Sequence, residues 1–349
     1  MLIPSYLSKK KHLNIYKYNI HYPQKKVKKL LWIILPLIVL IVYALNIYPF
    51  LSDSHPVENA NVLVAEGWLP PDLLDKAVEE FESKDYEFIA TTGVPFLPEF
   101  RMAYGGYLIY DFSDQEKWQI PQTYTLEVEA YSTPVNNEYA EMALFINDSL
   151  VFEGFTNESA QIYKTKVETN RIDSLAILFK NDAYADDEDR DLIIVNVRVN
   201  GKDLPPRSPN VIYDRGRKGG NDIYSANFNS VAEEAALELQ RRGIPKDKII
   251  AVPTEEREIN RTYNSALAFG NWLDKHAKQK NIKGINVISM GTHSRRSWIL
   301  FKKHINEEIP VGIISLKTQY TPDNDWWKTS YGIQRVLVES VKYVYTLFL

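Results

Sequence analysis

The feature that most constrains this chain is an uncharged apolar stretch from residue 30 to residue 51, which reads LLWIILPLIVLIVYALNIYPFL. A helix of about 20 residues crosses the ~30 Å hydrocarbon layer of a bilayer, so this stretch is long enough to span one. Lysines flank its N-terminal side only: Lys25, Lys26, Lys28 and Lys29. The positive-inside rule therefore places residues 1–29 in the cytoplasm as a basic tail, and everything after residue 51 outside the cell membrane.

Two other interpretations of this stretch are less consistent with its sequence. A cleaved signal peptide has a shorter apolar core, and a small-residue cleavage site follows it. Neither property is found here. A buried core helix would not carry such a dense lysine cluster at one end. Trp32, Tyr43 and Tyr48 suit the membrane interfaces, and Pro36 is tolerated in a spanning helix. We therefore expect a single-pass integral membrane protein.

Charge and composition narrow the possible partners. Residues 1–52 hold eight lysines and no Asp or Glu, although the whole chain has a formal net charge of −4. The remainder is therefore acidic, which argues against nucleic acid as a partner. The chain has no cysteine. Disulfides, thiolate metal sites and a cysteine nucleophile are therefore excluded.

Two segments of the chain, residues 60–100 and 208–349, share one repeating pattern. Short apolar runs typical of buried strands alternate with amphipathic helical patterns. The runs are 61–65, 87–91, 248–252, 285–289 and 311–315, and the helical patterns are 71–83, 230–242, 262–278, 297–304 and 333–347. This alternation predicts a Rossmann-like α/β domain, which is a parallel sheet with helices on both faces. Ligands of such sheets bind beyond the carboxyl ends of the strands.

The loops at those strand ends hold the candidate catalytic residues. His293 follows a strand, and Arg295 and Arg296 open the next helix, so an anion site with a histidine acid or base is one interpretation. A surface histidine beside two solvated arginines is the other. Arg261 begins a helix and either adds a cation or pairs with the acidic residues before it. Asn264 is a candidate hydrogen-bond donor to a ligand.

Other residues at the same loops complete the predicted site. Glu66 ends the first strand and is either a general base or a partner of one arginine. Gly67, Thr92 and Gly93 follow the first two strands and are the predicted contacts of a nucleotide-like ligand. Trp326 and Trp327 are more typical of core or lid packing than of a sugar platform. The glycine-rich segment 216–220 does not follow a strand and is interpreted as a linker.

The same segments carry a family resemblance. The pieces VLVAEGWLPPDLLDKA, FIATTG, INRTYNSALAFGNWL, VISMGTHSRRSWILF and WWKTSYGIQRVLVE occur in order over most of residues 60–95 and 225–349. This ordered set resembles the YdcF/SanA/ElyC-like family of bacterial envelope proteins. The resemblance implies a Rossmann-like fold and a role in envelope-polymer metabolism. One member of the family is reported to bind S-adenosylmethionine.

Residues 101–207 interrupt the α/β pattern. Short alternating runs dominate there, and turn residues such as Asn147-Asp148 and Asn200-Gly201 separate them. This spacing predicts an antiparallel β-sandwich inserted into one loop of the α/β domain. Its acidic segment 181–191, NDAYADDEDRD, holds six carboxylates. Composition alone favours a solvated turn there, although carboxylates are also the ligands that calcium prefers.

A second resemblance favours calcium. The string FKNDAYADDEDRDLIIVNVRVNG resembles the C-terminal part of calcium-dependent xylan-binding carbohydrate-binding modules. In such modules calcium bridges protein carboxylates to vicinal sugar hydroxyls. The resemblance implies Asp182 and Asp189 as calcium ligands, with Asp187 and Asp191 next, and it implies sugar contacts by Tyr184 and Arg190. Tyr184 either packs on the sugar or shapes the turn.

The sequence thus predicts a membrane-anchored envelope protein with two extracytoplasmic units. An inserted carbohydrate-binding module would bind polysaccharide with calcium, and the α/β domain would bind or act on an anionic envelope metabolite. The alternative is a non-catalytic scaffold or glycan receptor. A glycosidase needs two carboxylates at a suitable separation, and Glu66 alone is a clear candidate at the predicted strand ends.

Overall fold

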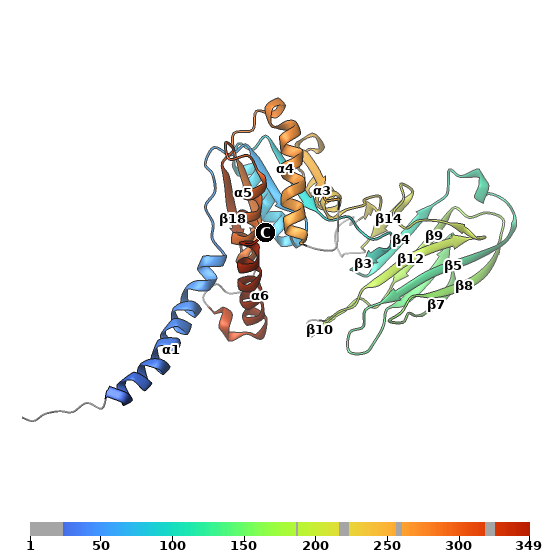
Figure 1. Ribbon diagram of the computed structural model, residues 1–349. Helices are drawn as coiled ribbons and strands as arrows, with labels where there is room; N and C mark the ends of the chain where they lie inside the picture. The colour runs from blue at the N-terminus through green and yellow to red at the C-terminus, as the bar shows by residue number, and fades with distance from the viewer. Residues whose placement is uncertain (1–23, 186–187, 216–222, 256–259, 318–324) are drawn as a thin grey trace, which may run out of the picture.

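The computed structural model describes residues 24–185, 188–215, 223–255, 260–317 and 325–349. Figure 1 shows three parts: a projecting N-terminal helix, a part in which helices surround a sheet, and a part built almost entirely of strands. The projecting helix is α1 (Gln24–Leu51). A mixed α/β chain with one N-terminal apolar helix was predicted from the sequence, and this is confirmed.

Five parallel strands form the central sheet. They are β1 (Val62–Glu66), β2 (Phe88–Gly93), β16 (Ile249–Pro253), β17 (Ile285–Met290) and β18 (Val311–Leu316). Their order in space is β16-β2-β1-β17-β18. The chain first builds outward from β1 to β16 and then returns to the other side of β1. The crevice between the carboxyl ends of β1 and β17 is therefore a topological switch point, where ligands of open α/β sheets bind.

Helices cover both faces of this sheet. Helices α2 (Pro71–Ser83) and α3 (Val231–Arg241) pack on one face around Leu63, Ile89 and Ile288. Helices α4 (Arg261–Lys280) and α5 (Ser294–His304) pack on the other face around Val64, Ala90 and Val287. The last helix, α6 (Ser330–Thr346), instead packs against α5 and α1.

Gly67 shows how closely α3 approaches the switch point. A Cβ atom at Gly67 would lie 2.7 Å from both the Thr92 and the Val231 carbonyl oxygens. Because backbone atoms cannot move aside cheaply, we expect Gly67→Ala to lower the free energy of unfolding by about 1–3 kcal/mol in urea titrations. At Gly154 the nearest atom to a new Cβ is the tip of the Phe152 ring, at 3.2 Å. Gly154→Ala should therefore cost less than about 1 kcal/mol, and an equal effect of both changes would contradict this account.

The third part, called the antiparallel part below, contains two large antiparallel sheets. Its strands are β3 (Phe100–Met102), β4 (Gly106–Asp111), β5 (Gln122–Ser132), β6 (Glu141–Ile146), β7 (Ser149–Phe155), β8 (Gln161–Thr169), β9 (Ser174–Phe179), β12 (Leu192–Val199), β13 (Lys202–Asp203), β14 (Val211–Asp214) and β15 (Ile223–Ser225). One sheet has the order β13-β12-β5-β8 with β3 beside β12, and the other has the order β15-β14-β4-β9-β6-β7. Apolar side chains of both sheets form one shared core. A small hairpin of β10 (Tyr184–Ala185) and β11 (Glu188–Asp189) carries the acidic segment.

This antiparallel part extends past the predicted boundary at residue 207. Strand β14 pairs with β4, and the core includes Val211, Tyr213 and Phe228. Two prolines at 205 and 206 precede this boundary, and the chain resumes a strand only five residues after them. Two short pairing strands after a proline turn give too weak a sequence pattern to be assigned to either part.

Helix α1 changes its surroundings along its length. Residues such as Leu35 and Val39 are exposed, whereas Tyr48 and Leu51 are buried in a cluster with Trp326 and Val336. By length and composition, residues 34–51 form the one helix of the described chain that could cross a bilayer. Trp326 thus serves core packing, as predicted for it, and Trp327 packs edge-on against it.

Candidate functional site

A cleft of about 500 Å³ opens at the carboxyl edge of the parallel sheet. Each wall comes from a segment that follows a strand or from α6. Trp68 follows β1, Gly93 ends β2, Arg261 opens α4, and His293 ends the short helix η3 (Gly291–His293) after β17. The cleft therefore lies at the switch point, where the strand-end residues named in the sequence converge.

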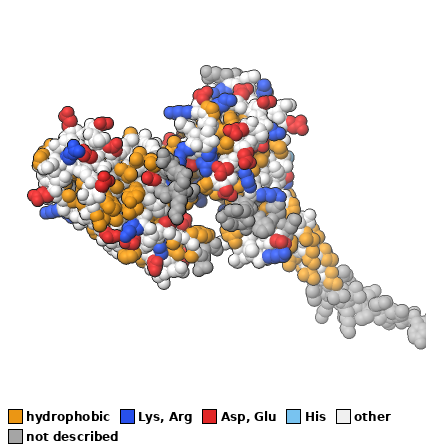
Figure 2. All heavy atoms as spheres, turned by 180° about the vertical axis from the view of Figure 1, so that it is seen from behind, with side chains coloured by type: hydrophobic (Ala, Val, Ile, Leu, Met, Phe, Trp, Pro, Cys, Tyr) orange, Lys and Arg blue, Asp and Glu red, His pale blue; other side chains and the backbone are white. Residues whose placement is uncertain are grey.

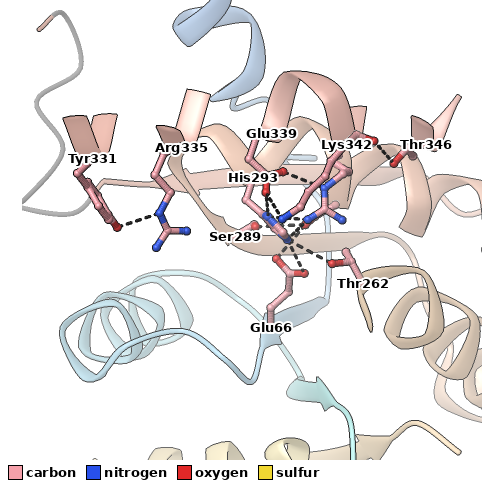
Figure 3. Close-up of polar contacts among 11 residues, drawn as sticks. Glu66, Thr262, Ser289, His293, Tyr331, Arg335, Glu339, Lys342 and Thr346 are labelled. Carbon is pink, nitrogen blue, oxygen red and sulfur yellow. Dashed lines mark hydrogen bonds and ion pairs between the residues drawn. The ribbon is translucent and has the colours of Figure 1, made fainter. Parts of the chain in front are cut away.

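His293 lies between two carboxylates at the base of this cleft. Its Nε2 atom is 3.8 Å from Glu66 Oε1, and its Nδ1 atom is 3.4 Å from Glu339 Oε1. Figure 3 shows Glu66 and Glu339 on opposite sides of the ring. Thr262 Oγ1 lies 3.3 Å from Nε2, and the Trp68 ring packs edge-on at 4.7 Å. This packing holds the imidazole in one orientation, as a histidine that transfers protons requires.

Glu66 is the most deeply buried member of this cluster, with 1% exposure. Ser297 donates to its Oε2 atom at 2.9 Å, and Ser289 lies 3.2 Å from Ser297. The other oxygen, Oε1, is buried without a hydrogen-bond partner among the described residues. It faces His293, so a proton on Nε2 has a carboxylate acceptor nearby.

Glu339 is held as a carboxylate. Burial alone would raise its pKa, but His293 and Arg296 together keep the pKa of Glu339 well below its ordinary value. Arg296 donates through Nε to Glu339 Oε2 at 2.9 Å. Its Nη2 atom also lies 2.8 Å from His293 Nδ1. The same Nη2 atom lies 3.0 Å from His293 Nε2, so Arg296 contacts both the ring and the Glu339 carboxylate.

The mouth of the cleft is rich in cations. The ionisable side chains along the wall are Arg261, Arg296, Arg335, Lys342, Glu339 and His293. The first turn of α4 adds backbone N–H groups, because Asn260 makes no side-chain cap there. Four cationic groups and a helix N-terminus against one lining carboxylate favour a negatively charged ligand.

The structure does not bring every predicted residue into the cleft. Arg295 points the other way: its guanidinium lies 4.0 Å from the Phe50 ring centroid and 2.7 Å from Asp53. It fixes the end of α1 to the α/β part. Asn264 lies on α4, and the cleft is lined by its neighbours Tyr263 and Ser265.

Two of the predicted nucleotide contacts, Gly67 and Gly93, lie directly against α3. The Val231 backbone of α3 fills the space over Gly67, and the Val231 side chain fills the space over Gly93. Thr92 is buried, with 1% exposure. These two glycines therefore allow the close approach of α3, and their contact with a nucleotide-like ligand stays a prediction. The segment 216–220 and the acidic residues Glu256 and Glu258 lie outside the described residues.

The sequence reasoning missed the contribution of α6. Glu339, Arg335 and Lys342 all come from this helix, and none follows a strand. A signal was present, because these polar residues recur at helical spacing within an otherwise apolar run. Their approach to His293 depends on how α6 packs against α5, which no local pattern encodes.

The second candidate site is the acidic segment of the antiparallel part. Asp191 Oδ2 accepts from Arg101 at 2.5 Å, and Asp189 lies 3.6 Å from the same guanidinium. The other Asp191 oxygen is buried without a partner among the described residues. Burial raises the pKa of Asp189 and of Asp191, and the nearby charge of Asp182 raises both further, against the lowering effect of Arg101. The predicted ligand Asp187 lies outside the described residues.

The oxygen atoms of these carboxylates are the type of ligand that a hard cation such as calcium prefers. Calcium takes oxygen ligands, and an orphaned buried oxygen beside two further carboxylates supplies them. Within the described chain, no three acidic or histidine side chains are already gathered closely enough to hold a metal. Arg101 is the cation present at Asp189 and Asp191, so calcium would share or displace its contacts.

Arg190 is buried, whereas a residue that contacts a sugar is expected to be exposed. Its guanidinium is 4% exposed and donates to the carbonyl oxygens of Glu138, Asn181 and Val135 at 2.9, 2.7 and 3.0 Å. These bonds fasten the acidic segment to the neighbouring loop. Tyr184, by contrast, is 69% exposed on β10.

Arg190→Lys should destabilise the fold measurably. An ammonium cannot reach three carbonyl groups in the fork geometry of a guanidinium, so we expect a loss of about 2–4 kcal/mol in the free energy of unfolding. Arg198→Lys is the matched control, because Arg198 is 31% exposed and pairs with Asp203. Its loss should stay below about 1 kcal/mol, and equal losses would show that the Arg190 contacts contribute little.

The match to a known protein family concerns the antiparallel part. The model of the CBM60 family, described as a Ca-dependent carbohydrate-binding module that is xylan-binding, matches residues 125–214. This range begins within β5, ends with β14 and includes the acidic segment. A comparison with curated proteins gave no match. The resemblance of residues 60–95 and 225–349 to the YdcF/SanA/ElyC-like family stays a prediction.

Solved structures of carbohydrate-active proteins are among the structural matches. One is a CBM60 module described as linking two calcium-dependent module families by circular permutation, with 21% identity, 24% of this chain, 61% of that chain and a TM-score of 0.20. A family 35 module from an environmental isolate matches with 14% identity, 34% of this chain, 76% of that chain and a TM-score of 0.19. An acetyl xylan esterase of the rumen bacterium Butyrivibrio proteoclasticus matches with 8% identity, 66% of this chain, 87% of that chain and a TM-score of 0.23. The match thus spans about three fifths of the first structure, and we base no argument on these scores.

Proposed function

We propose that this chain is a membrane-anchored envelope protein that binds polysaccharide through a calcium-dependent β-sandwich module. The observation that carries the proposal is the family match over residues 125–214. Asp182, Asp189 and Asp191 would hold the calcium, with Asp187 as a further ligand. Calcium would supply a cation to which vicinal sugar hydroxyls bind. The exposed Tyr184 beside these carboxylates is the proposed sugar-stacking residue, whereas Arg190 holds the segment in shape.

A binding experiment on the full-length protein tests this proposal. The detergent-solubilised chain is passed over immobilised xylan and over unrelated polysaccharides in excess calcium. Retention on at least one of them is expected, and Tyr184→Ala should weaken it by about tenfold, a typical loss for one aromatic contact. Because Tyr184 is exposed, this variant should unfold at the wild-type temperature. Failure of every polysaccharide to retain the wild type would contradict the proposal.

We infer that α1 anchors the protein as a single-pass helix with its N-terminus in the cytoplasm. The lysines before residue 30 and the exposed apolar surface of residues 34–42 support this. Leu51 is fully buried, and Arg295 pairs with Asp53 just beyond the helix. These contacts favour a retained anchor over a cleaved signal peptide, because cleavage would remove part of a packed core. Membranes washed with alkaline carbonate should retain the uncleaved chain, and its release would argue against anchoring.

For the α/β domain we propose a Rossmann-like fold that binds an anionic envelope metabolite at the cationic cleft. Arg261, Arg296, Arg335 and Lys342 would bind the charge. His293 between Glu66 and Glu339 would move a proton, if the ligand reacts there. The alternative is a scaffold without chemistry. Substituting His293→Asn and Arg296→Gln together distinguishes them, because an envelope defect with intact polysaccharide binding favours the metabolite site, and no defect favours the scaffold.

A further inference from the structure

Helix α6 presents three different stripes along its length. One stripe is polar and lines the cleft: Arg335, Glu339, Lys342 and Thr346. A second packs toward α1: Val336, Ser340 and Tyr343. The third is apolar and exposed, and its members recur at helical spacing: Ile333, Leu337, Val341 and Val344, with the exposed Phe348 just beyond the end of the helix. Val341 is 71% exposed and Phe348 is 83% exposed.

The composition of this apolar stripe is unusual for a helix that faces water. Exposed faces of helices in soluble proteins carry mainly charged and polar residues. The stripe has no charged residue, and it continues sideways into Val338, which is also exposed. An apolar strip of this length on a folded protein marks a surface that another apolar phase covers.

The contact between α6 and α1 indicates what covers the apolar stripe. Tyr43 Oη lies 2.8 Å from Ser340 Oγ, and Phe50 packs edge-on against Tyr343. Tyr43 precedes Leu51 by eight residues, which at a helical rise of about 1.5 Å places this contact roughly 12 Å before the end of α1. Helix α6 therefore lies beside the part of α1 that is proposed to cross the bilayer. Figure 2 shows the hydrophobic side chains of α1 gathered where that helix leaves the folded parts.

We propose that the apolar stripe of α6 lies in the outer leaflet of the lipid bilayer, beside α1. The inference rests on the proposed membrane anchor and adds a second membrane contact to it. A helix at the interface buries its apolar face about 5–10 Å into the boundary between headgroups and acyl chains. The polar stripe then stays in the cleft, and the bilayer fixes the wall that carries Glu339 and Lys342.

Depth-dependent fluorescence quenching tests the inference on the full-length chain. The protein has no cysteine, so a single cysteine can be labelled at each chosen position. The variants Val341→Cys, Val39→Cys and Asp274→Cys carry an environment-sensitive fluorophore on α6, on α1 and on the exposed surface of α4. Each is reconstituted into vesicles of phosphatidylethanolamine and phosphatidylglycerol with lipids that carry a quencher at a shallow or a deep acyl position.

We expect the shallow quencher to lower the emission at position 341 by about twofold, as for a label at the acyl boundary. Position 39 should respond most to the deep quencher, and position 274 to neither. Quenching at 39 without quenching at 341 would overturn the inference and leave the anchor intact. Absence of quenching at 39 would overturn the anchor itself. Energy transfer between labels at 341 without lipid quenching would show that a second copy covers the stripe, which also overturns the inference.

Discussion

Asp191→Asn is expected to abolish the stabilisation of the folded protein by calcium. A ligand present at about 100 times its dissociation constant stabilises the native state by about 2.7 kcal/mol. The thermal midpoint of the wild type should therefore rise when calcium is added. The variant should show no such rise, because the proposed site loses a buried carboxylate ligand and one of its negative charges. The measurement is thermal unfolding in excess calcium and in chelator.

Without calcium, the same variant should be nearly as stable as the wild type. Burial raises the pKa of Asp191, so ionising this group costs folding free energy above its unfolded pKa. Asparagine removes that cost and loses the Arg101 pair, and the two effects oppose each other. Arg101→Gln is the matched variant, because it removes the competing cation and keeps the carboxylates. It should retain the calcium-dependent rise, and retention of the rise in Asp191→Asn would contradict the proposed ligand set.

Glu339→Gln is expected to lower the free energy of unfolding at pH 7 by about 3 kcal/mol, as for removal of one partner from a buried ion pair. Glutamine keeps the shape and can still accept from Arg296, but it leaves that largely buried guanidinium without the counter-charge of Glu339. Chemical unfolding measures the difference. Glu308→Gln is the control, because Glu308 is exposed, and it should change the free energy by less than about 0.5 kcal/mol.

The stability difference between wild type and Glu339→Gln should depend on pH in a direction set by the pKa of Glu339. The pKa of Glu339 in the folded state lies below its ordinary value of 4.5. Its charge therefore stabilises the fold fully above pH 4.5, and this contribution is lost as the pH falls below that value. The difference between wild type and Glu339→Gln should shrink in the same range. A difference that is constant from pH 7 to pH 3.5 would show that the charge of Glu339 is not what stabilises the cluster.

The alternation of strands and helices was predictable because buried parallel strands are continuous apolar runs. Helix α2 was predicted over 71–83 and is observed there, and strand β1 was predicted to begin and end one residue earlier than it does. Glu66 and His293 were both predicted at the ligand-binding edge of the sheet, and the structure brings them together because β1 and β17 are neighbouring strands. Residues that lie at strand ends share an edge without any further packing information.

The remaining features depend on packing. Arg295 and Arg296 are adjacent on one helix and point about 100° apart, so only one of them can face the cleft. The sequence alone does not say which, because the choice depends on where α1 and α6 lie. Arg190 lies in a highly charged segment, and its burial depends on three carbonyl groups from distant residues. Periodicity describes local faces and carries no information on such contacts.

Titration calorimetry on the full-length protein tests the central claim most directly. A soluble oligosaccharide from the polysaccharide that retains the protein is titrated in calcium, in magnesium and in chelator. We predict binding in calcium, a loss of at least about 100-fold in affinity in chelator, and no rescue by magnesium, which prefers a stricter coordination geometry. Equal affinity in calcium and in chelator would contradict the account.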